Sequence, residues 1–282
     1  MKYRIIFRYA SKYNISAMCR YFKVSRSGYY SWVKRADTED KDMPLAQLIG
    51  QCHEKTRKTY GYRRIKLWLS REKGLVVNHK AILRIMNKTN QLSRIRRRRP
   101  WVRYGQKINR FANLLNQNFF TAHPNRKWVT DVTYIPTKQD GILYLSAIKD
   151  LFDGSIVAYK MSSTQSVRLV LETIREGCQK EKVAGGLVLH SDQGFQYTSP
   201  AYLNLLQQYG ISPSMSRAGN PLDNASMENF FGILKSECLN IAKPTTYQEA
   251  RDLVHDFIHF YNNHRLCLKT KLTPLEKRCQ SA

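Results

Sequence analysis

The stretch WVTDVTYI, at residues 128–135, reads as a buried β-strand that carries one carboxylate in its middle. Trp, Val, Thr, Tyr and Ile are residues that strands favour. A buried carboxylate without a partner costs several kcal/mol or becomes protonated, so Asp131 requires an explanation. A bound cation would keep it ionised, whereas an ion pair with Lys127 would give it a purely structural role. The stretch therefore predicts a central strand with a candidate metal ligand.

The segments after this strand alternate in a way that predicts a sheet. Two more strand-like segments, 143–150 and 155–161, follow turn signals and are expected to form an antiparallel meander with the first. The next segments alternate between helix and strand: 166–179 (helix), 187–192 (strand), 199–209 (helix), 211–216 (strand) and 223–237 (helix). The apolar segment 187–192 is expected to be central and parallel. The order predicts an α/β catalytic core that is ribonuclease-H-like, with a mixed five-stranded sheet flanked by helices.

Two later acids fall where this fold places ligands. Asp192 ends the strand-like segment 187–192, and Glu228 lies on the helix 223–237 that can pack over that end. Sixty residues lie between Asp131 and Asp192, and 35 lie between Asp192 and Glu228. Each acid alone has a structural alternative, since Asp192 can cap the turn before Gly194 and Glu228 can pair with the helix neighbours of Lys235. The three together predict a shared metal site.

Other polar residues near these strands are expected to be structural. They are a hairpin pair (Asp150 and Asp153), a helix cap (Asp223), a core histidine (His190) and two histidines on a helix surface (His255 and His259). Asn224 either assists near the metal or forms part of a cap or loop.

The charge of the chain is divided unevenly between its halves. Residues 1–127 hold 31 Lys and Arg against 6 Asp and Glu, whereas residues 128–282 hold 16 against 15. A basic half beside a neutral half indicates a polyanion-binding module joined to something else, and nucleic acid is the expected polyanion.

The cysteines and the apolar segments bear on the compartment. The six cysteines form no CxxC pair and no zinc-finger pattern, so we expect reduced thiols. No leader of charged then apolar residues opens the chain, and no apolar run approaches the ~20 residues of a membrane helix. An intracellular, cytoplasmic protein is expected.

Residues 1–36 have the pattern of a helix-turn-helix-like module. Four apolar residues at one-face spacing indicate a first helix: Ile5, Ile6, Tyr9 and Tyr13. Two helices then flank a turn at 23–25, and Ser25 is placed to cap the second helix. This second helix would present Arg26 and Ser27 to DNA. Helical hairpins that bind no DNA share the pattern.

Residues 37–99 predict a second helical DNA-binding module. Helices are expected from Pro44, after the segment YGYRR at 60–64, and from the cap Asn78. Arg63 and Arg64 are candidate DNA contacts or a solvated helix start. A basic run ends the module and can lie along a phosphate backbone or form a solvated linker: Arg94, Arg96, Arg97, Arg98 and Arg99. Residues 100–125 are expected to be an extended basic linker, and residues 126–282 the catalytic core with a C-terminal helix.

The motifs at 128–134, 190–194 and 219–231, with the segments 24–30 and 60–64, resemble those of one family. This family is the DDE transposases of the bacterial insertion sequence three group, in particular the second reading-frame product with its integrase-type core. The likeness covers nearly the whole chain, although Leu266 stands where many relatives have proline.

The resemblance implies catalytic and metal-binding roles for Asp131, Asp192 and Glu228. It also implies a DNA-binding role for Lys235, which lies two helical turns after Glu228. Two Mg²⁺ ions are the implied cofactor, with Mn²⁺ as a substitute. The implied partners are double-stranded DNA of element ends and target, a second copy of the chain, and an upstream reading-frame product, with no membrane.

Three acids suit the chemistry that the resemblance implies. Two Mg²⁺ ions roughly 3.5–4 Å apart can activate a nucleophile and stabilise a leaving oxygen, and Mg²⁺ prefers carboxylate ligands. Asp131 would bridge both ions. Water would nick the element end and leave a 3′-OH, which would attack a second phosphodiester. The alternatives are a DNA-binding regulator or partner subunit with an idle core, and a nuclease, which would not need two helix-turn-helix-like units.

Overall fold

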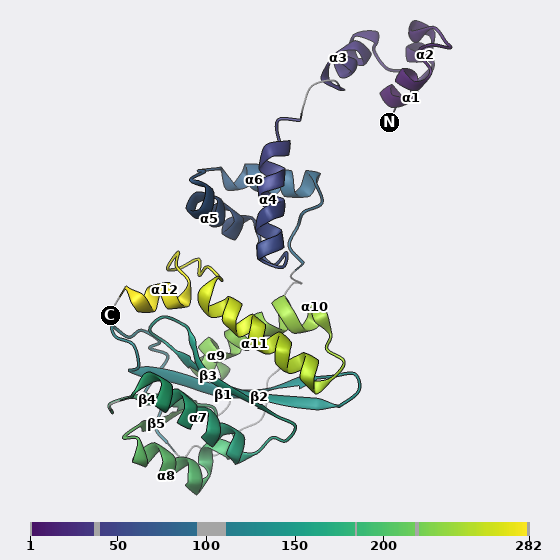
Figure 1. The fold of residues 1–282 in the computed structure, drawn as a ribbon. Coiled ribbons are helices and arrows are strands. Elements are labelled where there is room, and N and C mark those ends of the chain that lie inside the picture. The colour runs from purple at the N-terminus through teal and green to yellow at the C-terminus, as the bar shows by residue number, and fades with distance from the viewer. Residues whose placement is uncertain (1, 37–39, 95–110, 184, 218–219, 281–282) are drawn as a thin grey trace.

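The computed structural model describes residues 2–36, 40–94, 111–183, 185–217 and 220–280. Figure 1 shows a twisted sheet in the C-terminal half, with helices packed against both of its faces. The basic run Arg96–Arg99 and the first part of the expected linker, residues 100–110, lie outside the described residues. Residues 111–126, which lead into the sheet, contain turns and bends but neither helix nor strand.

The sheet confirms the predicted mixed, ribonuclease-H-like arrangement. Its strands are β1 (Lys127–Pro136), β2 (Ile142–Asp150), β3 (Ile156–Ser162), β4 (Val188–Ser191) and β5 (Ser212–Met215). They lie in the order β3-β2-β1-β4-β5. The pairs β1–β2 and β2–β3 are antiparallel, whereas β1–β4 and β4–β5 are parallel. The first strand, which carries Asp131, is therefore central.

Alternation along the strands divides the apolar side chains between two cores. Val129 of β1 joins the core on the face covered by α9 (Ala225–Leu234) and α11 (Tyr247–Asn263). Trp128 joins the core on the face covered by α7 (Val167–Glu181) and α8 (Pro200–Gln208). Neighbouring residues of a strand point to opposite faces, so one strand fills both cores.

The helix that carries Glu228 is longer and less regular than predicted. A 3₁₀ turn (Pro221–Asn224) leads into α9, which continues as a π-helical segment (Lys235–Leu239) and then α10 (Asn240–Ala242). A second 3₁₀ turn, Phe195–Thr198, follows β4. The chain closes with α12 (Pro274–Cys279), whose start has a capping box between Thr273 and Glu276. No helix in the described ranges is both long and apolar enough to span a bilayer.

The first N-terminal module is a three-helix unit: α1 (Lys2–Arg8), α2 (Ile15–Tyr21) and α3 (Arg26–Ala36). The predicted cap is present, since the Gly28 N–H donates to Ser25 Oγ at 3.0 Å. The predicted apolar face of the first helix was wrong, because α1 ends at Arg8. Only Ile6 of its four residues is buried, and Ile5, Tyr9 and Tyr13 are exposed.

The second module consists of α4 (Met43–Lys55), α5 (Tyr62–Lys73) and α6 (His79–Lys88). Its predicted ends are found, with Asn78 capping α6 and Gly74 in the left-handed conformation after α5. It docks on the C-terminal segment, since the Leu266 N–H donates to Tyr60 Oη at 2.9 Å and Arg71 forms a 2.7 Å ion pair with Glu276.

Candidate active site

Asp131 and Asp192 lie level with each other on neighbouring parallel strands. The register pairs Lys127 with Val188 and Val129 with His190, an offset that places Asp131 opposite Asp192, the residue just after β4. Neighbouring strands are about 4.8 Å apart, and residues at the same level point to the same face. The two carboxylates are therefore close neighbours at the carboxyl end of β4, where α/β sheets bind ligands.

Each of these carboxylates is held by one oxygen and leaves the other available. Asp131 Oδ1 accepts the N–H of Val132 at 2.7 Å, and Asp192 Oδ1 accepts the N–H of Gly194 at 2.8 Å. The second oxygen of each accepts no hydrogen bond from a described residue. Asp192 therefore does cap the turn before Gly194, but only through Oδ1, and Oδ2 is left available for a ligand. The ion pair considered for Asp131 is not formed, because Lys127 Nζ donates to backbone carbonyls in the segment before β1.

Glu228 reaches the same end of the sheet from α9. The start of this helix is fastened to β1, because Asn224 Nδ2 donates to the carbonyl of Thr130 at 3.3 Å. Lys149 Nζ of β2 donates to the carbonyl of Ser226 at 3.2 Å. Glu228 follows in the first turn of α9 and is exposed. The helix therefore presents this acid to solvent beside the strand that carries Asp131.

Burial and neighbouring charge shape the titration of Asp131. Burial raises the pKa of its carboxyl group well above the usual range, and the negative charges of Asp192 and Glu228 raise it further. The Val132 N–H and the Lys235 ammonium act in the opposite direction. All three acids thus lie within electrostatic reach of one another, which is the arrangement that a divalent cation relieves.

Lys235 faces this group of acids. Its Nζ lies 4.6 Å from the ring centroid of Tyr134 on β1, a cation–π contact. Burial lowers its pKa, and the charge of Asp131 raises it. The sequence indicated Lys235, but it did not indicate Tyr134. Tyr134 is exposed in the structure, whereas in the sequence it counted only as a residue that strands favour.

The donor set fits a hard divalent cation. Carboxylate oxygens are the ligands that Mg²⁺ prefers, and the Oδ1 of Asn224 is buried without a hydrogen-bond partner among the described residues. In the described part of the chain, no three His, Cys, Asp or Glu side chains already form a group that could hold a metal. The carboxylates of Asp131, Asp192 and Glu228 would therefore move together around the ion as its ligands, with Asn224 beside them.

The other acids near the sheet have structural partners. Asp150 and Asp153 are buried and pair with Arg278 of α12, at 3.1 and 2.6 Å. Asp223 does not cap a helix as predicted. It is buried and accepts hydrogen bonds from the backbone and side chain of Arg217. These contacts fix the loop before α9.

The histidines also have structural positions. His190 is buried between Ser214 and Ser216, with ring nitrogens 2.8 and 3.0 Å from their hydroxyls, as expected for a core residue. Burial lowers the pKa of His190 to about 4, so the ring is neutral near pH 7. His255 and His259 are exposed on α11, and the hydroxyl of Tyr159 lies 2.6 Å from His255 Nδ1.

The candidate DNA contacts of the N-terminal modules differ in their surroundings. Arg26 and Ser27 are exposed at the start of α3, although Arg26 also donates to Ser16 Oγ at 3.3 Å. Arg63 is exposed, with its guanidinium 5.1 Å from the ring centroid of Tyr62. Arg94 is exposed at the end of the second module.

Arg64 is engaged within the protein. It donates to the carbonyl of Leu266 and forms a 3.7 Å ion pair with the buried Glu237. Arg64 therefore joins the second module to the helix that carries Glu228, a contact that the sequence did not indicate.

Comparisons with known proteins bear on the whole chain. Residues 121–221 and 228–281 match families described as "Integrase core domain", and residues 39–99 match an "HTH-like domain". The putative transposase InsK for insertion sequence element IS150 of Escherichia coli (strain K12) is 37% identical over 270 residues, covering 95% of each chain. The chain belongs to the family of insertion-sequence transposases.

A second transposase and a solved structure are less identical to this chain. Transposase InsF for insertion sequence IS3A of Escherichia coli (strain K12) is 29% identical, covering 94% of this chain and 93% of its own. The solved structure of the HTLV-2 integrase catalytic core domain in complex with magnesium (dimeric form) is 16% identical, covers 56% of this chain and 98% of its own, and has a TM-score of 0.44. The resemblance to the insertion sequence three transposases is confirmed.

Proposed function

We propose that this transposase binds the terminal inverted repeats of its insertion sequence and cuts and joins DNA strands at the element ends. The observation that carries the proposal is the level placement of Asp131 and Asp192 on neighbouring parallel strands, with α9 fastened beside them. Two half-buried acids side by side at the ligand-binding end of a sheet repel each other without a cation, which supports a metal-dependent reaction.

The proposed roles follow from what each residue contacts. Asp131, Asp192 and Glu228 would hold two divalent cations, Mg²⁺ or in its place Mn²⁺. These ions would supply charge stabilisation for in-line attack on a phosphodiester. Asp131 and Asp192 each keep one oxygen oriented by a backbone N–H, so the free oxygen is preorganised as a ligand. Lys235 would contact a phosphate of the DNA next to the acids.

The rest of the chain would hold DNA. The two helical modules carry most of the excess positive charge, and we propose Arg26, Ser27, Arg63 and Arg94 as contacts, together with the run Arg96–Arg99. Arg64 is already engaged with Glu237, so we propose that it acts indirectly by positioning the second module. Acting on two element ends requires at least two copies of the chain on DNA.

A strand-joining assay tests the proposal. Purified protein is incubated with Mg²⁺ and a labelled duplex carrying an element end, and Asp192→Asn is run beside it. The proposal predicts nicked and joined products with the wild type and none with the variant, while both bind the duplex. Binding without joining by both proteins would show the alternative, a DNA-binding regulator or partner subunit with an idle core.

A further inference from the structure

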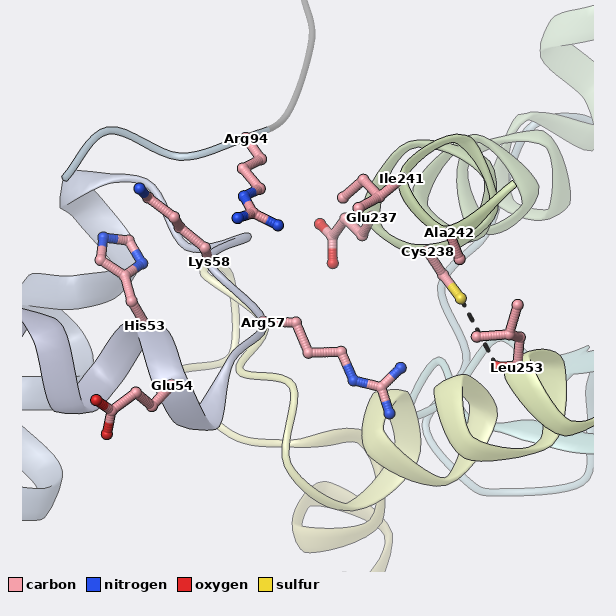
Figure 2. Close-up of a pocket in the computed structure, with 10 residues that line it drawn as sticks. All are labelled: His53, Glu54, Arg57, Lys58, Arg94, Glu237, Cys238, Ile241, Ala242 and Leu253. Carbon is pink, nitrogen blue, oxygen red and sulfur yellow. Dashed lines mark hydrogen bonds between the residues drawn. The ribbon is translucent and has the colours of Figure 1, made fainter. Parts of the chain in front are cut away.

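A cavity of about 510 Å³ lies where the second helical module meets the helix that carries Glu228. One wall comes from the end of α4 and the segment after α6, and the other comes from the π-helical segment, α10 and α11 (Figure 2). A cavity of this volume can take a ligand larger than a single ion. Its position between the two parts indicates a ligand that spans both.

Three cations of the second module line the cavity, and backbone contacts hold them together. Arg57 and Lys58 follow α4 and both have left-handed backbone, at φ 54° and 59°. The Arg94 N–H donates to the carbonyl of Lys58 at 3.0 Å, and Ser93 Oγ donates to the carbonyl of Thr59 at 3.0 Å. Figure 2 shows the side chains of Arg57 and Arg94 extending into the space between the two walls.

These three cations are poorly neutralised by the protein. One acid of the same wall, Glu54, also lines the cavity, but Figure 2 shows its carboxylate turned away from the space between the two walls. The nearest acid of Arg57 is Asp256 at 3.9 Å, and both side chains are largely exposed, so the pair is weak. Among the described residues, neither Lys58 nor Arg94 forms an ion pair. Glu237 on the opposite wall already accepts two hydrogen bonds from Arg265, at 2.8 and 2.7 Å, so little of its charge is left for the cavity.

His53 adds an unpaired polar atom to the same wall. It is buried, and its Nε2 is bonded to the carbonyl of Gln91 at 2.7 Å, so Nε2 carries the proton. Its Nδ1 is buried without a hydrogen-bond partner among the described residues. Burial lowers the pKa of the His53 ring, so Nδ1 is a hydrogen-bond acceptor. A water molecule between Nδ1 and a ligand oxygen would give it a partner.

We propose that this cavity binds phosphodiester groups of DNA where the DNA crosses from the second module to the catalytic core. Guanidinium groups match the geometry of phosphate oxygens, and the lysine supplies a third positive charge. One wall is continuous with α9, so a strand held here is held beside the helix that presents Glu228. The site rests on the proposed function for its DNA, but it concerns binding alone.

The test measures binding of a labelled random-sequence duplex without divalent metal, across a series of salt concentrations. The variant Arg57→Gln/Lys58→Gln/Arg94→Gln removes three cations. It places no β-branched side chain at positions 57 and 58, where the backbone is left-handed. The matched control, Arg168→Gln/Arg175→Gln/Lys182→Gln, removes three exposed cations at α7, on the opposite face of the sheet from α11. Melting temperatures establish that both variants are folded.

The proposal predicts that the cavity variant flattens the slope of log K against log salt by about 2 to 3 and weakens binding by on the order of 100-fold near 0.1 M salt. The control should change the slope by less than about 1. Equal effects in the two variants would overturn the proposal. If the cavity variant does not fold, a photo-crosslinking p-benzoylphenylalanine at position 58 should attach to the duplex, and the same group at position 175 should not. Equal attachment at both positions would also overturn it.

This outcome is separable from that of the strand-joining assay. In one outcome, the wild type fails to join strands while the cavity variant binds the duplex with a flatter salt dependence than the wild type. This result would contradict the proposed function and leave the phosphate site supported. If instead the wild type joins strands and the cavity variant binds the duplex as the wild type does, the proposed function stands and the phosphate site is contradicted.

Discussion

Arg265 and Glu237 form a buried ion pair in which the guanidinium makes two hydrogen bonds to the carboxylate, at 2.8 and 2.7 Å. Glu237 lies on the π-helical segment that continues α9, and Arg64 of the second module reaches the same carboxylate at 3.7 Å. One carboxylate therefore joins the helix that carries Glu228, the C-terminal segment and the second module.

The change Glu237→Gln should lower the free energy of unfolding by about 3–5 kcal/mol, because it leaves the buried Arg265 without its counter-charge. Urea unfolding followed by circular dichroism measures this. The control is Glu172→Gln, which removes an exposed i,i+4 partner of Arg168 and should cost under about 0.5 kcal/mol. Similar losses in both variants would contradict the structural importance of the buried pair.

The change Tyr60→Phe should loosen the second module. The Tyr60 hydroxyl accepts the Leu266 N–H at 2.9 Å and donates to the carbonyl of His264 at 3.3 Å, so its loss leaves a buried N–H unpaired at a cost of about 1–3 kcal/mol. Hydrogen exchange should become faster at Leu266 and along α5. The control is Tyr62→Phe, whose hydroxyl makes no hydrogen bond with a described residue. Unchanged exchange in Tyr60→Phe would show that this contact does not hold the module.

The pairing of Asp223 with Arg217 predicts a pH-dependent contribution to stability. Burial raises the pKa of Asp223, but hydrogen bonds from Arg217 and Gln117 outweigh it and hold the pKa well below the usual range. The folded carboxylate thus binds fewer protons than the unfolded one. Its stabilisation is complete above the unfolded pKa of about 3.9 and declines as the pH falls below it.

The variant Asp223→Asn tests this dependence. The difference in free energy of unfolding between wild type and variant should be largest near neutral pH and should shrink as the pH falls below about 4. Urea unfolding at a series of pH values measures the difference. A difference that stays constant, or grows on acidification, would contradict the assigned ion pair.

The change Lys235→Gln should weaken DNA binding by the loss of one phosphate contact. The slope of log K against log salt for a duplex should fall by about 0.9, because one fewer counterion is released. Fluorescence anisotropy without divalent metal measures the slope. Lys182→Gln at the end of α7 is the control and should leave it unchanged. An unaltered slope in Lys235→Gln would place Lys235 away from the DNA backbone.

The sheet and the acids could be predicted from local pattern. Residues 128–135 have the composition of a strand, and Asp192 follows an apolar segment that had to be parallel and central. The register that places Asp131 level with Asp192 was not predicted, because it depends on how β1 and β4 pack in the sheet. Asn224 was likewise left between a site role and a cap, since its bond to Thr130 depends on packing.

The junction between the modules could not be predicted in this way. Arg64, Glu237 and Arg265 are far apart in the sequence, and nothing local marks an arginine that is held by a distant carboxylate. The π-helical segment that turns Glu237 inward has no sequence signature of its own. The exposed Tyr9 and Tyr13 were misassigned because helical spacing does not show where a helix ends.

A Mn²⁺ titration of the protein bound to an element-end duplex tests whether the three acids bind metal. Free Mn²⁺ is followed by electron paramagnetic resonance, for the wild type and for Asp131→Asn, with Asp252→Asn on α11 as an exposed control. We expect about two Mn²⁺ sites per chain in the wild type and in the control, and the loss of both sites in Asp131→Asn. Equal Mn²⁺ binding by Asp131→Asn and the wild type would contradict metal binding by the three acids.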